Sequence, residues 1–144
     1  MAEQRIHIWA GTTNKTEDQF YKYFDQSKFI KDNHSFNTDE SYARNTPDFN
    51  LRSQFGKAID KQYDYDANWI TIFYSRKRIS IQAAIEELPI WNDQIEVDIY
   101  QACVSKGIST ANVILCYADE ELNIDKPLES YNDMIYVGSF KIPS

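Results

Sequence analysis

The sequence contains few of the residues on which metal-binding and disulfide-rich proteins depend. Its 144 residues include two cysteines, two histidines, four glycines and four prolines. Two cysteines without a neighbouring histidine form no recognisable ligand set, so we expect Cys103 and Cys116 to be small, reduced hydrophobic residues inside the fold. The shortage of glycine and proline leaves little room for linkers, which predicts one domain over residues 1–144.

Long hydrophobic runs are also missing. No stretch has the apolar length that is needed to cross a bilayer, and residues 1–9 lack a basic region followed by an apolar segment, so we expect no signal peptide. These absences predict a cytoplasmic protein without a membrane partner.

Basic residues are scarce in one part of the chain. Residues 86–133 contain eleven acidic side chains and only Lys106 and Lys126 as bases, a net charge of −9 against −7 for the whole chain. Such segregation bears on the choice of partner more than on the fold. It points first to a basic partner.

Hydrophobic spacing predicts an α+β fold, with a single mixed β-sheet of about four strands and helices packed against it. The segment 68–74 is apolar on both faces, which is typical of a central strand. Helix starts are indicated by Thr16, Ser53, Ser80 and Asn92 as caps, and Gly107 closes the longest helix. The expected strands are residues 5–9, 68–74, 113–117 and 134–140.

In two segments the hydrophobic residues show no regular spacing of the kind typical of a helix or a strand. Residues 25–50 are long for a loop in a compact domain, which indicates a functional or mobile segment. Residues 118–133 form a connection that is longer than a tight hairpin. Its part from Asp119 to Asp133 holds six acids and one base, whereas the acids of residues 86–98 lie on expected helices, where the helix dipole alone explains Asp93 and Glu96.

The sequence offers few candidates for catalysis. It contains no phosphate-binding glycine motif, nucleophile elbow or HExxH motif. A hydrolase would have to use His7, His34, Cys103 or the pair Asp64 and Asp66. Cys103 falls on a buried helical stripe and His7 in a strand, so structural roles are favoured for both.

Several blocks of sequence stand out: Ile6–Gly11 followed by an aromatic helix, Ser53–Lys57, Tyr63–Asp66 before a strand, and the two closing strands at 111–117 and 136–140. In this order they resemble the immunity protein 22 family. The resemblance implies an α+β antidote that is encoded beside a bacterial toxin and that binds and blocks the toxin domain. It implies no enzymatic activity and no cofactor. The segment 25–50 is longer than is typical of the family.

We therefore expect a non-enzymatic immunity protein that neutralises a cognate toxin domain through an acidic, aromatic-containing surface. The toxin is expected to be basic, with a nuclease as one candidate, and direct nucleic-acid binding is not expected. The alternative is an acidic regulatory or small-ligand-binding module without a toxin partner. For Tyr117 and Tyr131, exposure near the acids and a place in the core are equally open. The residues predicted to contact the partner are Asp64, Asp66, Tyr117, Asp119, Glu120, Glu121, Asp125, Glu129, Tyr131 and Asp133.

Overall fold

The computed structural model describes residues 4–31, 48–124 and 129–142. These residues form two compact units, one within residues 1–17 and 66–144 and the other within residues 18–65. His34 and Asp125 lie outside the described residues, as does most of the segment 25–50. The single domain over residues 1–144 stays a prediction.

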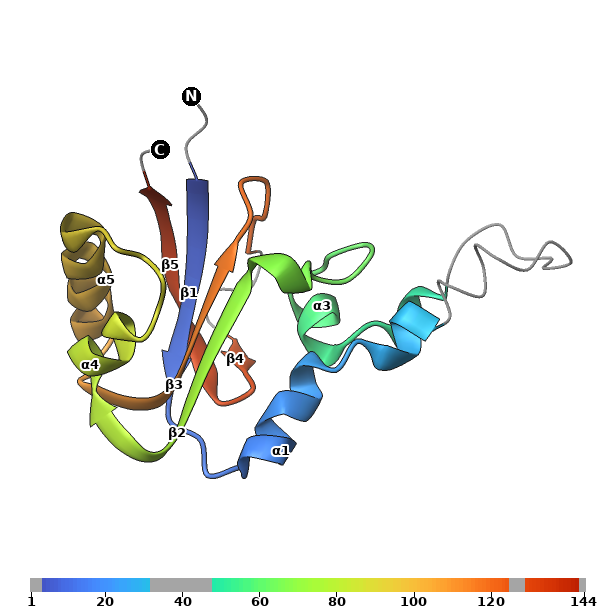
Figure 1. Ribbon diagram of the computed structural model, residues 1–144, viewed down its shortest axis with the longest axis horizontal. Helices are drawn as coiled ribbons and strands as arrows, with labels where there is room; N and C mark the ends of the chain where they lie inside the picture. Colours follow the sequence, from blue (N-terminus) through green and yellow to red (C-terminus); the bar gives the residue numbers. More distant parts are fainter. Residues whose placement is uncertain (1–3, 32–47, 125–128, 143–144) are drawn as a thin grey trace, which may run out of the picture. The chain divides into compact units, whose positions relative to one another are not determined.

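The first unit is built on a five-stranded antiparallel sheet in the order β2-β3-β1-β5-β4 (Figure 1). The α+β class is confirmed, but every strand pair is antiparallel, so the sheet is not mixed, and it has five strands where about four were expected. The strands are β1 (Gln4–Gly11), β2 (Ile70–Ser80), β3 (Thr110–Ala118), β4 (Ser130–Tyr131) and β5 (Met134–Ile142).

The predicted central position of residues 68–74 is wrong. These residues enter β2, which is an edge strand, whereas β1 and β3 occupy inner positions. Asn68 and Trp69 precede the strand in a 3-10 turn, η3 (Ala67–Trp69). Apolar residues on both faces indicate that a strand is covered on both sides, but they carry no information on whether it has one neighbouring strand or two.

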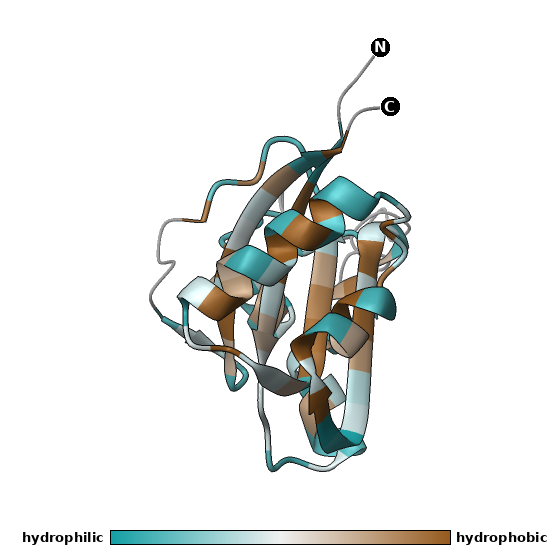
Figure 2. Cartoon of the chain, turned by 90° about the vertical axis from the view of Figure 1, so that its left-hand side faces the viewer, coloured by the Kyte–Doolittle hydropathy of each residue, from teal (hydrophilic) through white to brown (hydrophobic). Residues whose placement is uncertain are grey.

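Two helices cover one face of the sheet: α4 (Ile81–Glu86) and α5 (Asp93–Ser105) (Figures 1 and 2). Their starts follow the predicted caps, because the Ser80 side chain accepts from the Ala83 amide and the Asn92 side chain from the Ile95 amide. Gly107 follows α5 with φ +81°, as a C-terminal glycine requires. The core beneath these helices includes Ile8, Ile99 and Ile114, all fully buried.

The opposite face of the sheet carries a cluster of aromatic rings. Trp9 is fully buried there and lies 5.1 Å from Tyr136 and 6.1 Å from Tyr131, measured between ring centroids. His7 lies on the same face, two residues from Trp9 in β1. The first unit therefore has an aliphatic core under its helices and an aromatic cluster on the other side of the sheet.

The second unit is helical. It contains most of α1 (Glu17–Tyr21), followed by η1 (Lys22–Phe24), η2 (Phe49–Leu51) and α3 (Gln54–Ala58), and residues 27–31 are also helical. Its core is a run of rings, with Phe24 5.2 Å from Phe55 and Phe55 5.5 Å from Tyr65. The predicted cap of α3 is confirmed, because Ser53 Oγ accepts from the Gly56 amide at 2.9 Å.

Candidate functional site

The predicted acidic connection begins in a turn that Asp119 shapes. Its Oδ1 accepts hydrogen bonds from the amides of Glu121 and Leu122, at 2.9 and 3.1 Å. The side chains of Glu120 and Glu121 are exposed. The Asp119 carboxylate thus has a local structural role, whereas the side chains of the two glutamates that follow have no hydrogen bond or ion pair within the described residues.

The far end of this connection is a tight hairpin, which sequence reasoning missed. Strands β4 and β5 are joined by Asn132 and Asp133, which have φ values of +55° and +68°. Two consecutive residues with positive φ are the mark of a type I′ turn, in which Asn and Asp are favoured. A strand of two residues has no period that a sequence could reveal.

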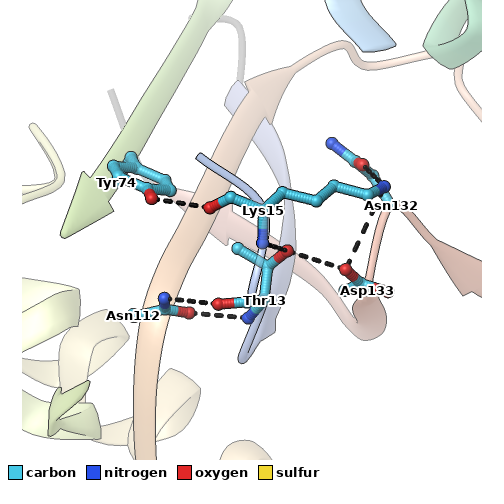
Figure 3. Close-up of polar contacts among 6 residues, drawn as sticks. All are labelled: Thr13, Lys15, Tyr74, Asn112, Asn132 and Asp133. Atoms are coloured by element: carbon cyan, nitrogen blue, oxygen red, sulfur yellow. Dashed lines mark hydrogen bonds and ion pairs between the residues drawn. The ribbon is translucent and has the colours of Figure 1, made fainter. Parts of the chain in front are cut away.

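Asp133 also belongs to a polar cluster that fixes the loop after β1 (Figure 3). Its carboxylate accepts from Thr13 Oγ1 at 2.7 Å and lies 4.0 Å from Lys15 Nζ, which also donates to Asn132. The Asn112 side chain bonds both backbone groups of Thr13, at 2.8 and 2.9 Å. The Asp133 carboxylate is therefore engaged within the fold by Thr13 and Lys15. Sequence reasoning did not identify this cluster, because its members lie far apart along the chain.

An open depression of about 520 Å³ adjoins the polar cluster. Lys15 and Tyr74 line it, together with the exposed Arg76, and the Tyr74 hydroxyl donates to the Lys15 carbonyl at 2.7 Å. The small-ligand alternative requires a defined pocket, and this depression is one place in the first unit where such a ligand would be sought.

The paired carboxylates Asp64 and Asp66 have different surroundings. Asp64 is buried, and its two oxygens accept from the amide and hydroxyl of Ser53 and from the Tyr65 amide at 2.6 to 2.8 Å. Asp66 is exposed and caps η3 by accepting from the Asn68 amide at 2.9 Å. The two residues belong to different units, and neither arrangement is that of an acid–base pair.

Tyr117 and Tyr131 lie in the interior, with 1% and 2% of their surface exposed. The Tyr117 hydroxyl accepts from the Asp66 amide at 2.9 Å, and Tyr131 packs edge-on against Trp9. Of the two alternatives open for these rings, the structure favours the core. Among the predicted residues that the structure describes, the exposed acids are Asp66, Glu120, Glu121 and Glu129, together with the partly engaged Asp133.

Burial and hydrogen bonding restrict the residues that a hydrolase would have to use. Burial lowers the pKa of His7, against the opposing effects of Asp119, whose carbonyl accepts from Nε2 at 3.0 Å. Nδ1 then accepts from the Tyr136 hydroxyl at 2.8 Å, so both ring nitrogens are engaged. Burial raises the pKa of the Cys103 thiol to about 11 and that of Cys116 to about 12, which keeps both protonated near neutral pH.

His7 should make the stability of the fold depend on pH. The unfolded chain protonates this histidine near 6.5, while the folded state holds it neutral at a lower pKa, so the unfolded state binds more protons as the pH falls. The free energy of unfolding is therefore expected to decrease as the pH falls through 6.5 toward the folded pKa. Urea unfolding at pH 7.5 and 5.5 measures this loss.

The matched control is His7→Gln, which removes the titrating group. Its unfolding free energy should change less between the two pH values than that of the unaltered chain. Equal changes in both proteins would contradict the assignment of this pH dependence to His7.

Neither a metal-binding cluster nor a membrane-spanning helix is present among the described residues. Among residues 4–31, 48–124 and 129–142, no three His, Cys, Asp or Glu side chains are grouped to hold a metal ion. Within the same residues, no helix has the length and apolar character of a membrane span.

Comparison with known families decides the class. The family model described as immunity protein 22 matches residues 6–142. The chain belongs to this family. Membership of the immunity protein 22 family supports a toxin-neutralising role in general, and proteins of this kind are generally not enzymes. No curated protein and no solved structure matches the chain.

Proposed function

We propose that this chain binds a cognate toxin domain in the cytoplasm of the producing cell and blocks it without catalysing a reaction. The match to the immunity protein 22 family over residues 6–142 carries the proposal. The net charge of −7 favours a basic toxin, of which a nuclease with a basic substrate groove is one candidate. The same charge repels a phosphate backbone, so we propose no direct nucleic-acid binding, and the binding requires no membrane or cofactor.

The exposed acids of the connection are proposed to attract the toxin before contact. Glu120, Glu121 and Glu129 are solvated, and charges of this kind raise association rates more than they strengthen the final complex. Tight inhibition needs in addition a ring or an arginine that becomes buried between the partners. Because Tyr117 and Tyr131 are buried in the fold, we propose that another side chain provides this contact.

Co-expression tests the proposed function. The toxin domain encoded beside this chain's gene is expressed alone and together with the chain in the same bacterial host. We expect growth to stop with the toxin domain alone and to recover when the chain is present, and the two purified proteins should elute together in size-exclusion chromatography. An unrelated acidic protein of similar size serves as the control for non-specific rescue.

Failure to rescue growth and failure to form a complex would contradict the proposal. The alternative, an acidic regulatory or small-ligand module, predicts this failure. It also predicts that the depression beside Lys15 and Arg76 holds a small molecule.

A further inference from the structure

The two helices that cover the sheet of the first unit, α4 and α5, carry acidic residues and no basic ones. Residues 81–105 contain five acids (Glu86, Glu87, Asp93, Glu96 and Asp98) and no Lys, Arg or His. Within the described residues none of the five forms an ion pair; Asp98 accepts a hydrogen bond from the Gln94 side chain at 2.9 Å. The helix dipole favours acids only in the first turn of α5, so it accounts for Asp93 and Glu96 and not for the acids at the end of α4.

A groove of about 310 Å³ runs between the two helices. Glu86, Asp93 and Glu96 line it, and its apolar surface comes from Ile85, Val97 and Tyr100. Val97 and Tyr100 are exposed to solvent on the outer side of α5. Figure 2 looks onto this layer and shows hydrophobic bands among hydrophilic ones on both helices. The groove therefore combines apolar surface with a carboxylate rim.

An exposed tryptophan lies in the connection between the same two helices, adjacent in sequence to the first turn of α5, which carries Asp93 and Glu96. Trp91 is 90% exposed, and it immediately precedes Asn92, the cap of α5. A ring of this size gains most from burial among all side chains, and tryptophan is the ring that anchors protein interfaces most often. Its neighbours along the chain give it no cover in the described structure. We name Glu86, Trp91, Asp93, Glu96, Val97 and Tyr100 together the acidic helix face.

We propose that the acidic helix face docks an arginine-rich segment of a protein partner. The choice of occupant follows from charge complementarity, because three carboxylates around one groove can be desolvated only against cations. Arginine fits better than lysine, since its planar guanidinium binds carboxylates with two parallel hydrogen bonds and stacks on indole and phenol rings. The apolar surface of Val97 and Tyr100 would receive the methylene stem of such a side chain.

This inference rests on the proposed function for the identity of the partner, which would be the toxin domain. It assigns different tasks to two acidic regions. The connection with Glu120 and Glu121 attracts the toxin at a distance, whereas the acidic helix face makes the contacts that hold it. Association and dissociation rates separate these tasks, because rim charges change the former and buried contacts change the latter.

Dissociation of the complex with the neighbouring toxin domain is the first test. Trp91→Ala and Glu86→Gln/Glu96→Gln should each raise the dissociation rate at least about tenfold, the range of interface anchors. The matched controls are Trp69→Ala, which removes the other exposed tryptophan (55% exposed), and Glu120→Gln/Glu121→Gln, which removes the same charge from the connection. Both controls should change the dissociation rate less than about twofold. The variant Glu120→Gln/Glu121→Gln should in addition slow association.

Equal effects of the test variants and their controls on dissociation would overturn the inference and leave the proposed function intact. Because all the substituted residues are exposed or half-exposed, thermal unfolding should be close to that of the unaltered chain, which confirms that the variants fold.

A second test needs no toxin. Hexa-arginine peptide is added to the ¹⁵N-labelled chain, and the indole N–H signals of its three tryptophans are followed. We expect the Trp91 signal to shift and those of Trp9 and Trp69 to stay, and the shift to disappear in Glu86→Gln/Glu96→Gln. Equal shifts at Trp69 and Trp91, or none, would overturn the inference. If the toxin domain does not bind the unaltered chain but the Trp91 signal responds to the peptide, the proposed function fails and the docking face stands.

Discussion

Replacing Gly11 with alanine is expected to lower the free energy of unfolding by more than about 3 kcal/mol, the upper range for an added methyl group in a packed site. A β-carbon on Gly11 would lie 2.2 Å from the carbonyl oxygen of Asp133 and 2.9 Å from the α-carbon of Met134. Both are backbone atoms at the start of β5, so no side chain can turn away. The pairing of β1 with β5 would have to open at this end, together with the hydrogen bond from Thr13 to Asp133. Urea unfolding followed by circular dichroism measures the loss.

The control for this substitution is Gly107→Ala. Gly107 has φ +81°, but a β-carbon there would meet nothing within 4 Å. Alanine at this position should cost only about 1–2 kcal/mol, which is the strain of the left-handed conformation. A cost for Gly11→Ala no larger than that of its control would contradict the close approach of β1 to the turn before β5.

Replacing Asp64 with alanine is expected to cost about 4 kcal/mol. The substitution removes the acceptor of three hydrogen bonds and leaves the amides of Ser53 and Tyr65 buried and unpaired. Asp64 also has φ +74°, a conformation that aspartate tolerates better than alanine. The cap of α3 depends on the same group, since Ser53 Oγ donates to Asp64 while it accepts from Gly56. We expect a weaker helical signal in circular dichroism and a lower midpoint of urea unfolding.

Asp66→Ala provides a control of identical chemistry two residues along the chain. Asp66 is exposed and its carboxylate accepts one hydrogen bond, so its removal should cost about 1 kcal/mol, as for an ordinary cap. Should the two substitutions prove equally costly, the buried network around Asp64 would not have the role assigned to it.

The same network explains why a glycine lies inside helix α3. Gly56 lies inside α3, where alanine would be favoured by about 1 kcal/mol on helix propensity. A β-carbon there would lie 1.9 Å from Asp64 Oδ1. The carboxylate occupies the space that any larger residue would need, and nothing in the local sequence of the helix reports a group eight residues away.

The parts of the fold that sequence reasoning predicted correctly are those that local chemistry determines. The caps Ser53, Ser80 and Asn92, and Gly107 after α5, each act within a few residues, so the sequence around them is sufficient. The position of β2 at the edge was not predictable in this way, because it depends on which strands pair across the chain. Strand β4 is too short to show a period.

The same difference, between what the local sequence determines and what packing across the chain determines, applies to the acidic and aromatic residues of the candidate surfaces. Of the acids of residues 86–98, the helix dipole explained Asp93 and Glu96, which is a local explanation. The groove that Glu86, Asp93 and Glu96 line depends on how α4 and α5 pack, which the sequence does not report. Conversely, Tyr117 and Tyr131 lie next to acids in the sequence but enter the aromatic side of the sheet.

The position of β1 inside the sheet has a consequence for when the protein becomes active after its synthesis. Strand β1 is flanked by β3 and β5, with Ile6 opposite both Ala118 and Phe140. A ribosome must therefore translate as far as β5, which ends at Ile142, before β1 can gain both of its neighbours, and pairings so distant in sequence form slowly. In a cell that makes this chain and its toxin together, the chain would gain its complete sheet only after β5 has been translated.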